Sequence, residues 1–233
     1  MDAEKDFFTI YFAGELFTHK DLIGNAMLAE EIFARSGGKF RCALPQNFEQ
    51  RKDDPKSIRD EDILNLLECD LAIFNYDGQE LDSGTVVEFM FAKFADIPAL
   101  LLRSDFRSGG DCGDSSESCP PWNLMTSFYP RTKTLLLNSA QLYKESVMEY
   151  YAGEESTYTS ASSGSQWGRI MLGKIAARIV ESLEGLLKIP PTMNRDCARG
   201  VYDWLSKMPD FSAPFAAERI AGALKRKSGK NMI

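Results

Sequence analysis

The sequence predicts an α/β protein with a central parallel sheet of about five strands, in a doubly wound (flavodoxin-like or Rossmann-like) order, with a C-terminal helical extension. Two observations support this class. Short apolar runs alternate with longer segments of helical periodicity, as when 7–12 is followed by 21–34. The run Leu71–Phe74 is apolar throughout and lies between Asp70 and the Asp77-Gly78 turn signal, which is typical of a strand buried on both faces.

The predicted elements follow one another along the chain as strands and crossover helices. The strands are expected at 7–12, 41–44, 71–74, 97–102 and 133–137. Helices are expected at 21–34, from a cap at Ser57 or Asp60 through Asp62 to Leu67, at 86–95, and at 167–188, 194–207 and 214–227. Residues 45–50 are predicted as a loop and 103–119 as a mobile polar loop. These boundaries define the sheet edge at which ligands of such folds bind.

Composition changes divide the chain into three parts. Residues 1–150 carry the α/β pattern, 151–166 form a low-complexity polar linker, and 167–233 form the helical extension. The basic residues that end the extension, Lys225 to Lys230, are predicted to be a solvated helix end. The catalytic residues are therefore expected in the first part.

The charge balance limits the classes of partner. The chain has 34 acidic and 27 basic side chains and a net charge of −7, which disfavours binding to nucleic-acid polymers or anionic membranes. No apolar run approaches the ~18 residues of a membrane span, and the N-terminus is too acidic for a signal peptide. We expect a cytoplasmic protein whose partners are small molecules.

Histidine and cysteine chemistry has little support. The single histidine is His19, so a conventional Ser-His or Cys-His triad is excluded unless that residue is the base. The five cysteines are odd in number and lack paired metal spacing, so reduced thiols are expected, although Cys112 and Cys119 could pair under oxidation. We predict no metal and no cofactor. Carboxylate chemistry is what remains.

Two carboxylates lie where the third predicted strand leads into a helix. Asp82 and Glu88 flank Ser83-Gly84-Thr85, in which Gly84 permits a tight turn. The positive end of the helix dipole would favour an ionised Glu88, as a carboxylate nucleophile requires. The alternative is that Thr85 and Glu88 form a capping box and serve only the helix. With Asp62 at the start of the preceding helix, three acids are expected to converge on one crevice; the alternative for Asp62 is an ordinary first-turn acid.

The first strand ends in a second candidate binding segment. Ala13-Gly14 predicts a turn with close backbone approach, which usually marks a ligand crevice. At the neighbouring strand end, Gln46 is favoured over Gln50 as a reader of a base edge, because an amide carries both a donor and an acceptor. Either glutamine could instead be a solvated loop residue.

These residues together resemble the nucleoside 2-deoxyribosyltransferase family. The resemblance rests on Asp62, then Asp70, an apolar strand, and Asp82-Ser-Gly-Thr-x-x-Glu88. It also rests on Ile10-Tyr-Phe-Ala-Gly14 and on Pro121-Trp-Asn-Leu-Met125. It covers roughly residues 8–140, and the segment beyond departs from the compact members of the family.

The resemblance assigns roles to residues that their own context leaves open. It implies that Tyr11 hydrogen-bonds the nucleophilic carboxylate and that Phe17 stacks beneath the base, whereas either could be a packed aromatic. It also implies that Asn123 and Met125 reach into the active site of a neighbouring subunit, so a homo-oligomer with shared sites is expected. The alternative for this segment is a short capping turn with a buried Met125.

The implied reaction exchanges the base of a 2′-deoxynucleoside for a free nucleobase. Glu88 would attack C1′ to give a covalent deoxyribosyl-enzyme, and a second base would restore the configuration. Asp62 would protonate the leaving base, and Asp82 would anchor a sugar hydroxyl or assist at the base.

Two alternatives to base exchange remain. One is hydrolysis of 2′-deoxynucleoside 5′-monophosphates, which the lack of arginine in 13–18 and the charges of Glu15 and Asp82 disfavour. The other is a non-catalytic nucleotide-sensing module whose acids are only helix caps.

Overall fold

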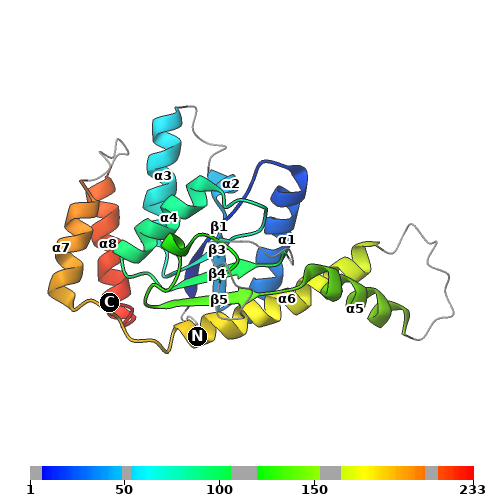
Figure 1. The fold of residues 1–233 in the computed structure, drawn as a ribbon. Coiled ribbons are helices and arrows are strands. Elements are labelled where there is room, and N and C mark those ends of the chain that lie inside the picture. The colour runs from blue at the N-terminus through cyan, green and yellow to red at the C-terminus, as the bar shows by residue number, and fades with distance from the viewer. Residues whose placement is uncertain (1–6, 49–53, 106–119, 153–163, 208–214) are drawn as a thin grey trace, which may run out of the picture.

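The computed structural model describes residues 7–48, 54–105, 120–152, 164–207 and 215–233. Within these residues, five strands form a sheet with the order β2-β1-β3-β4-β5, and every neighbouring pair is parallel. The strands are β1 (Phe8–Ala13), β2 (Phe40–Ala43), β3 (Leu71–Asn75), β4 (Ala99–Arg103) and β5 (Thr132–Leu136). This is a doubly wound order, so the predicted fold class is confirmed (Figure 1).

The helices begin and end near the predicted positions, apart from differences at α2, α3, α4 and α5. They are α1 (His19–Arg35), α2 (Pro45–Phe48), α3 (Pro55–Glu68), α4 (Ser83–Phe94), the 3-10 helix η2 (Leu124–Thr126), α5 (Ser139–Tyr151), α6 (Gly164–Leu186), α7 (Arg195–Leu205) and α8 (Ala216–Gly229). Helix α2 replaces part of a predicted loop, α5 was not predicted, and both α3 and α4 begin earlier than expected. The two earlier starts affect the site and are explained below.

Side-chain alternation along β1 divides the core into two layers. Tyr11 and Ala13 point into the layer that contains α3, α4, α7 and α8. Ile10 and Phe12 point into the layer that contains α1, α5 and α6. Figure 1 shows the same division, with α6 running along the face of the sheet opposite to α3 and α4. Parallel strands covered on both faces are apolar throughout, which explains the continuous apolar run of β3.

The C-terminal helices complete both layers. Helix α6 packs along α1, and α8 packs between α3 and α7. A buried ion pair at the amino ends of β4 and β5 fastens this part of the chain: Arg131 lies 3.1 Å from the Asp96 carboxylate and donates to the main-chain oxygen of Met232. Asp96 in turn accepts from the backbone N–H groups of Thr192 and Met193. These hydrogen bonds offset part of the cost of burying the two charges, although the Nε of Arg131 has no acceptor among the described residues.

Two lysines in the basic tail are not solvated as predicted. Lys227 is fully buried and donates to the main-chain oxygen of Leu67 (2.7 Å) and to the Tyr202 hydroxyl (3.0 Å). Lys230 donates to the Asp70 carboxylate (2.7 Å). The sequence pattern places both residues on a helix end, but only the packing of α8 against α3, α7 and the segment before β3 brings acceptors to them. Lys225 and Arg226 are exposed, as expected.

Some predictions concern residues outside those described. The middle of the predicted linker (153–163), most of the predicted polar loop (106–119) and the pair Cys112 and Cys119 fall there. Of the cysteines that the structure describes, Cys42, Cys69 and Cys197 are free thiols. No helix among the described residues is long and apolar enough to cross a membrane.

Replacing Lys227 by methionine should change how stability depends on pH. Burial lowers the pKa of Lys227 to about 7, whereas the unfolded chain holds its proton to about pH 10.4. Between these values the unfolded state binds more protons, so wild-type stability should rise with pH relative to Lys227→Met, by at most about 1.4 kcal/mol per pH unit. Urea unfolding at pH 6.5, 8 and 9.5 measures this. The exposed Lys225→Met is the control, and a pH-independent difference for Lys227→Met would contradict the prediction.

Candidate active site

The centre of the candidate site is a hydrogen bond between a strand and a helix. The hydroxyl of Tyr11, on β1, donates to Glu88 Oε1, on α4, at 2.6 Å. Tyr11 is buried, and its pKa is raised well above the usual value by that burial and by the negative charges of Glu88 and Asp62. It therefore stays protonated and remains a donor at neutral pH. Three elements thus bring Tyr11, Glu88 and Asp62 together at the carboxyl edge of the sheet.

The start of α4 shows that Glu88 does not cap this helix. Asp82 is the N-cap residue, and its carboxylate accepts from the Thr85 N–H (2.7 Å) and the Thr85 hydroxyl (2.9 Å). The helix begins at Ser83, so Glu88 lies in its second turn, and the capping-box alternative is wrong. The expected dipole effect is correspondingly weak, because it falls off within the first turn. Gly84 lies beside the Asp82 carboxylate, where an added Cβ would approach Oδ2 to 3.2 Å.

The start of α3 also differs from the prediction. The N-cap is Asp54, which accepts from the Ser57 N–H, and Pro55 follows it. Neither Ser57 nor Asp60 caps the helix, and Asp60 is fully buried. An Asp-Pro pair is a strong start signal because proline fits the first helical position without losing a hydrogen bond. Asp62 therefore lies in the third turn, so its position has no explanation as a first-turn acid.

Ala13 and Gly14 end β1 against the end of β3. Ala13 pairs with Phe74, and a Cβ on Gly14 would lie 2.9 Å from the Cβ of Asn75. Only glycine permits this approach without a shift of one chain, as the sequence pattern predicted. The contact fixes the two strand ends that flank the site.

Acidic side chains gather at the rim of the site. The pKa of Glu15 is raised, first by partial burial and then by the charges of Asp21, Asp82 and Asp77. Glu15 also lies beside Gly78, where an added Cβ would approach Glu15 Oε1 to 3.2 Å. Asp82 thus belongs to this acidic group as well as to the helix cap. The rim carries like charges that an anionic ligand would have to oppose.

Two of the predicted substrate-binding residues follow the carboxyl ends of β1 and β2. Phe17, in the turn after β1, is 74% exposed and does not plug the core. Gln46, on α2, donates through Nε2 to the main-chain oxygen of Leu22 on α1 at 2.9 Å. That hydrogen bond uses one of the two amide N–H groups, so the other N–H and the side-chain oxygen of Gln46 remain for a ligand.

Asn123 and Met125 lie on η2. The Asn123 side chain caps this short helix by accepting from the Met125 N–H at 2.8 Å, as the capping-turn alternative supposes. Met125 is 74% exposed, which contradicts the buried methionine of that alternative. The turn is closed by a bond from Trp122 Nε1 to Ser127 Oγ (3.0 Å). Asn123 and Met125 therefore project from a rigid turn.

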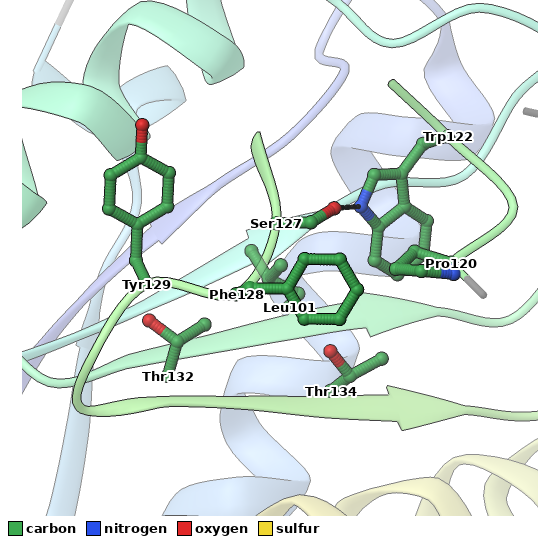
Figure 2. A pocket seen from close by; sticks show the side chains of 8 residues that line it. All are labelled: Leu101, Pro120, Trp122, Ser127, Phe128, Tyr129, Thr132 and Thr134. Atoms are coloured by element: carbon green, nitrogen blue, oxygen red, sulfur yellow. Dashed lines mark hydrogen bonds between the residues drawn. The ribbon is translucent and has the colours of Figure 1, made fainter. Parts of the chain in front are cut away.

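A cavity of about 120 Å³ lies between this segment and strands β4 and β5 (Figure 2). Its lining is Leu101, Pro120, Trp122, Ser127, Phe128, Tyr129, Thr132 and Thr134. Tyr11, Asp62 and Glu88 are not among these residues, so this cavity is distinct from the carboxylate site.

Sequence reasoning missed three residues at the carboxyl edge. Asn75 is the last residue of β3, Arg103 is the last residue of β4, and Asp77 lies in the loop between β3 and α4. Each is a polar residue at the end of an apolar strand or shortly after it, and that position is the signal that could have identified them.

The described cysteines do not offer nucleophiles near the site. Burial raises the pKa of the Cys42 and Cys69 thiols to about 12, which disfavours the reactive thiolate. Among the described residues, no cluster of three or more histidine, cysteine, aspartate or glutamate side chains could hold a metal ion. The chemistry that the described residues place at the site is carboxylate and phenol chemistry.

Comparison with known families identifies this part of the chain. Residues 10–125, which include every strand end described above except that of β5, match the family model for nucleoside 2-deoxyribosyltransferase. These residues belong to the nucleoside 2-deoxyribosyltransferase family. The resemblance predicted from the sequence is confirmed, and the family match supports a nucleoside 2-deoxyribosyltransferase-like activity on nucleosides and bases.

Solved structures also align with the chain. A conserved protein from Enterococcus faecalis V583 aligns at 22% identity with a TM-score of 0.44, covering 77% of this chain and 98% of that protein. A 2-desoxiribosyltransferase from Leishmania mexicana aligns at 22% identity with a TM-score of 0.44, covering 64% of this chain and 99% of its own. No curated protein matches the chain.

Substituting Gly14 should disturb the site through the backbone. In Gly14→Ala the new Cβ meets Asn75 at 2.9 Å, so the ends of β1 and β3 must move apart. We expect a loss of about 1–3 kcal/mol in unfolding free energy, as in overpacked cores. Gly24→Ala is the control: it lies in α1 with nothing within 4 Å, and should be neutral or stabilising by about 0.5–1 kcal/mol. Chemical unfolding compares the two, and equal effects would refute the close-contact explanation.

Proposed function

We propose that this protein transfers the 2-deoxyribosyl group between purine or pyrimidine bases through a covalent deoxyribosyl-glutamate at Glu88, with retention of configuration. The observation that carries the proposal is the bond between the Tyr11 hydroxyl and Glu88 Oε1, beside Asp62, within the family-matched region. An ionised glutamate held by a neutral phenol, with a second carboxyl group nearby, is the arrangement that a two-step glycosyl transfer needs.

The proposed chemistry has two displacements at C1′. Because Oε1 accepts the Tyr11 hydroxyl, we assign attack on C1′ to Oε2. The C1′–N bond breaks as the ester bond forms, its electron pair goes to the base, and Asp62 supplies the proton. A second base then attacks C1′ and releases Glu88, while Asp62 takes back a proton. Two inversions give net retention, and no cofactor takes part in either step.

The remaining predicted residues would bind the substrate. We propose that Asp82 holds a sugar hydroxyl or assists at the base. We also propose that Gly84, Ala13 and Gly14 let the backbone approach the substrate closely. Phe17 offers an exposed ring on which a base could stack. Gln46 would read a base edge through its side-chain oxygen and its remaining amide N–H, because the other N–H donates to Leu22.

The acidic rim favours a nucleoside over its 5′-phosphate. Three carboxylates lie close enough to Glu15 for their charges to raise its pKa: Asp21, Asp82 and Asp77. A phosphate at this rim would meet like charges in a partly buried setting, where repulsion is stronger than in water. We therefore propose 2′-deoxynucleosides as substrates and a role in cytoplasmic nucleotide salvage.

Incubation with deoxyinosine and adenine tests this function. Transfer should produce deoxyadenosine and hypoxanthine in equal amounts, and deoxyinosine monophosphate should react more slowly than deoxyinosine. Hypoxanthine without deoxyadenosine, or faster reaction of the monophosphate without acceptor base, would establish hydrolysis instead. The absence of both products with all common bases would leave a non-catalytic binding module.

Glu88→Gln should abolish transfer while the fold persists. The substitution keeps the shape of the side chain but removes the anionic nucleophile, so we expect at least a ~10³-fold loss of kcat. Intact-protein mass spectrometry should detect a deoxyribosyl adduct on wild type after acid quenching, and none on the variant. Glu80→Gln, at an exposed position in the loop that precedes α4, is the control and should retain activity. Full activity of Glu88→Gln would disprove the nucleophile assignment.

The exposed apolar surface around η2 supports a shared site. Leu124, Met125 and Phe128 are exposed on this segment, and Val87 and Phe94 are exposed on the adjoining α4. An exposed apolar surface of this kind is typical of a contact with another chain. We propose that a second copy covers it in a homo-oligomer, and that Asn123 and Met125 then complete the partner's site at the 5′ side of the sugar.

Mixing inactive variants tests the shared site. Asn123→Ala and Glu88→Gln should each be nearly inactive, but reassembly from both should recover up to about a quarter of wild-type activity. Random dimers are mixed about half the time, and each mixed dimer has one intact site of two. The control mixture pairs Glu88→Gln with Asp62→Asn, which affect the same site and should not complement. Confirmed reassembly without recovery would make Asn123 a structural turn residue.

A further inference from the structure

A reciprocal set of hydrogen bonds joins the end of β4 to the loop between β3 and α4, residues 76–82. From β4, Arg103 donates through Nη1 to the main-chain oxygen of Tyr76 (2.6 Å) and through Nη2 to that of Gly78 (3.1 Å). From the loop, the Asp77 carboxylate accepts from the Ser104 N–H (2.6 Å), the Ser104 hydroxyl (2.7 Å) and the Asp105 N–H (2.8 Å). We call this set the loop clamp.

The loop clamp uses a buried charge where a packed apolar residue would suffice for stability. Arg103 is 4% exposed, and taking a guanidinium out of water is costly unless its donors are used. Its fork engages two carbonyl groups that lie two residues apart, and Gly78 has a φ of +103°, a conformation that L side chains rarely adopt. The loop backbone is therefore shaped to meet the guanidinium.

We propose that Arg103 is a positioning residue for the two carboxylates that follow this loop. The loop leads directly to Asp82, whose carboxylate fixes the first turn of α4 through Thr85, and Glu88 lies on the next turn. The start of α4 thus depends on where the loop backbone is held, and the 2.6 Å contact of Glu88 with Tyr11 depends on the start of α4. The role assigned to Arg103 rests on the proposed function of Glu88.

Loss of the loop clamp should reduce catalysis more than binding. A displacement of a reacting group by about 1 Å can cost about 100-fold in rate. Arg103→Met removes both hydrogen bonds, so we expect kcat for deoxyribosyl transfer to fall about 10- to 100-fold and KM to change by less than about threefold. Arg103→Lys can reach one carbonyl group with its ammonium and should recover part of the loss.

Arg131 provides a matched control. It is also 4% exposed and also donates to main-chain oxygens, but it lies at the opposite, amino edge of the sheet. Arg131→Met should lower the unfolding midpoint at least as much as Arg103→Met. It should leave kcat within about twofold of wild type when assayed well below that midpoint.

Hydrogen exchange measured by mass spectrometry separates this inference from the proposed function. Arg103→Met should speed exchange in peptides that contain the Ser104, Asp105 and Thr85 amides, and Arg131→Met should not. If wild type neither transfers nor hydrolyses any 2′-deoxynucleoside, the proposed function is wrong. The effect of Arg103 on the loop is then tested by the hydrogen-exchange rates alone. Unchanged exchange at these amides, or an unchanged kcat in an active enzyme, would overturn the positioning role of Arg103.

Discussion

The parallel pairing of β1 with β3 is the constraint on which the site depends. Tyr11 pairs with Ala72, and both point into the layer that contains α3 and α4. Because side chains alternate along a strand, a slip of one residue would turn Tyr11 into the opposite layer and replace it with Phe12. The Tyr11 hydroxyl would then be absent from the layer of α3 and α4, the helices that carry Asp62 and Glu88. The close contact of Gly14 with Asn75 holds this register at the end where it matters.

The two edges of the sheet differ in how their charged side chains are paired. At the amino edge, buried charges face opposite ones, as in Arg131 with Asp96 and Lys230 with Asp70. At the carboxyl edge, like charges gather around Glu15, and their mutual repulsion opposes folding. Stabilising pairs of opposite charge thus lie at the amino edge, and repulsion between like charges lies at the carboxyl edge. Such a division is common where an active site imposes unfavourable interactions.

The C-terminal helices stabilise the part of the fold that carries the candidate site. Helix α6 covers the layer opposite the site, and α8 packs against α3, the helix that carries Asp62. Arg219 on α8 bonds Glu61, the residue beside Asp62, at 2.9 Å, and also Glu68 at 2.7 Å. These interactions hold α3 against α8 in the same layer. A segment beyond the family-matched region therefore supports the element that supplies the proposed acid.

The sequence by itself determined the five strands, most of the helices and the family, and it supplied the carboxylates on which the proposed chemistry rests. It did so because periodicity, turn residues and the spacing of Asp82 and Glu88 are local properties of the chain. Helix starts were less certain, since Asp54-Pro55 and Asp82 competed with other plausible caps. Only the tertiary structure decided that Tyr11 meets Glu88, that Lys227 is buried, and that Arg103 reaches Tyr76 and Gly78. Those contacts join residues more than twenty positions apart, and their geometry exists only once the layers have packed.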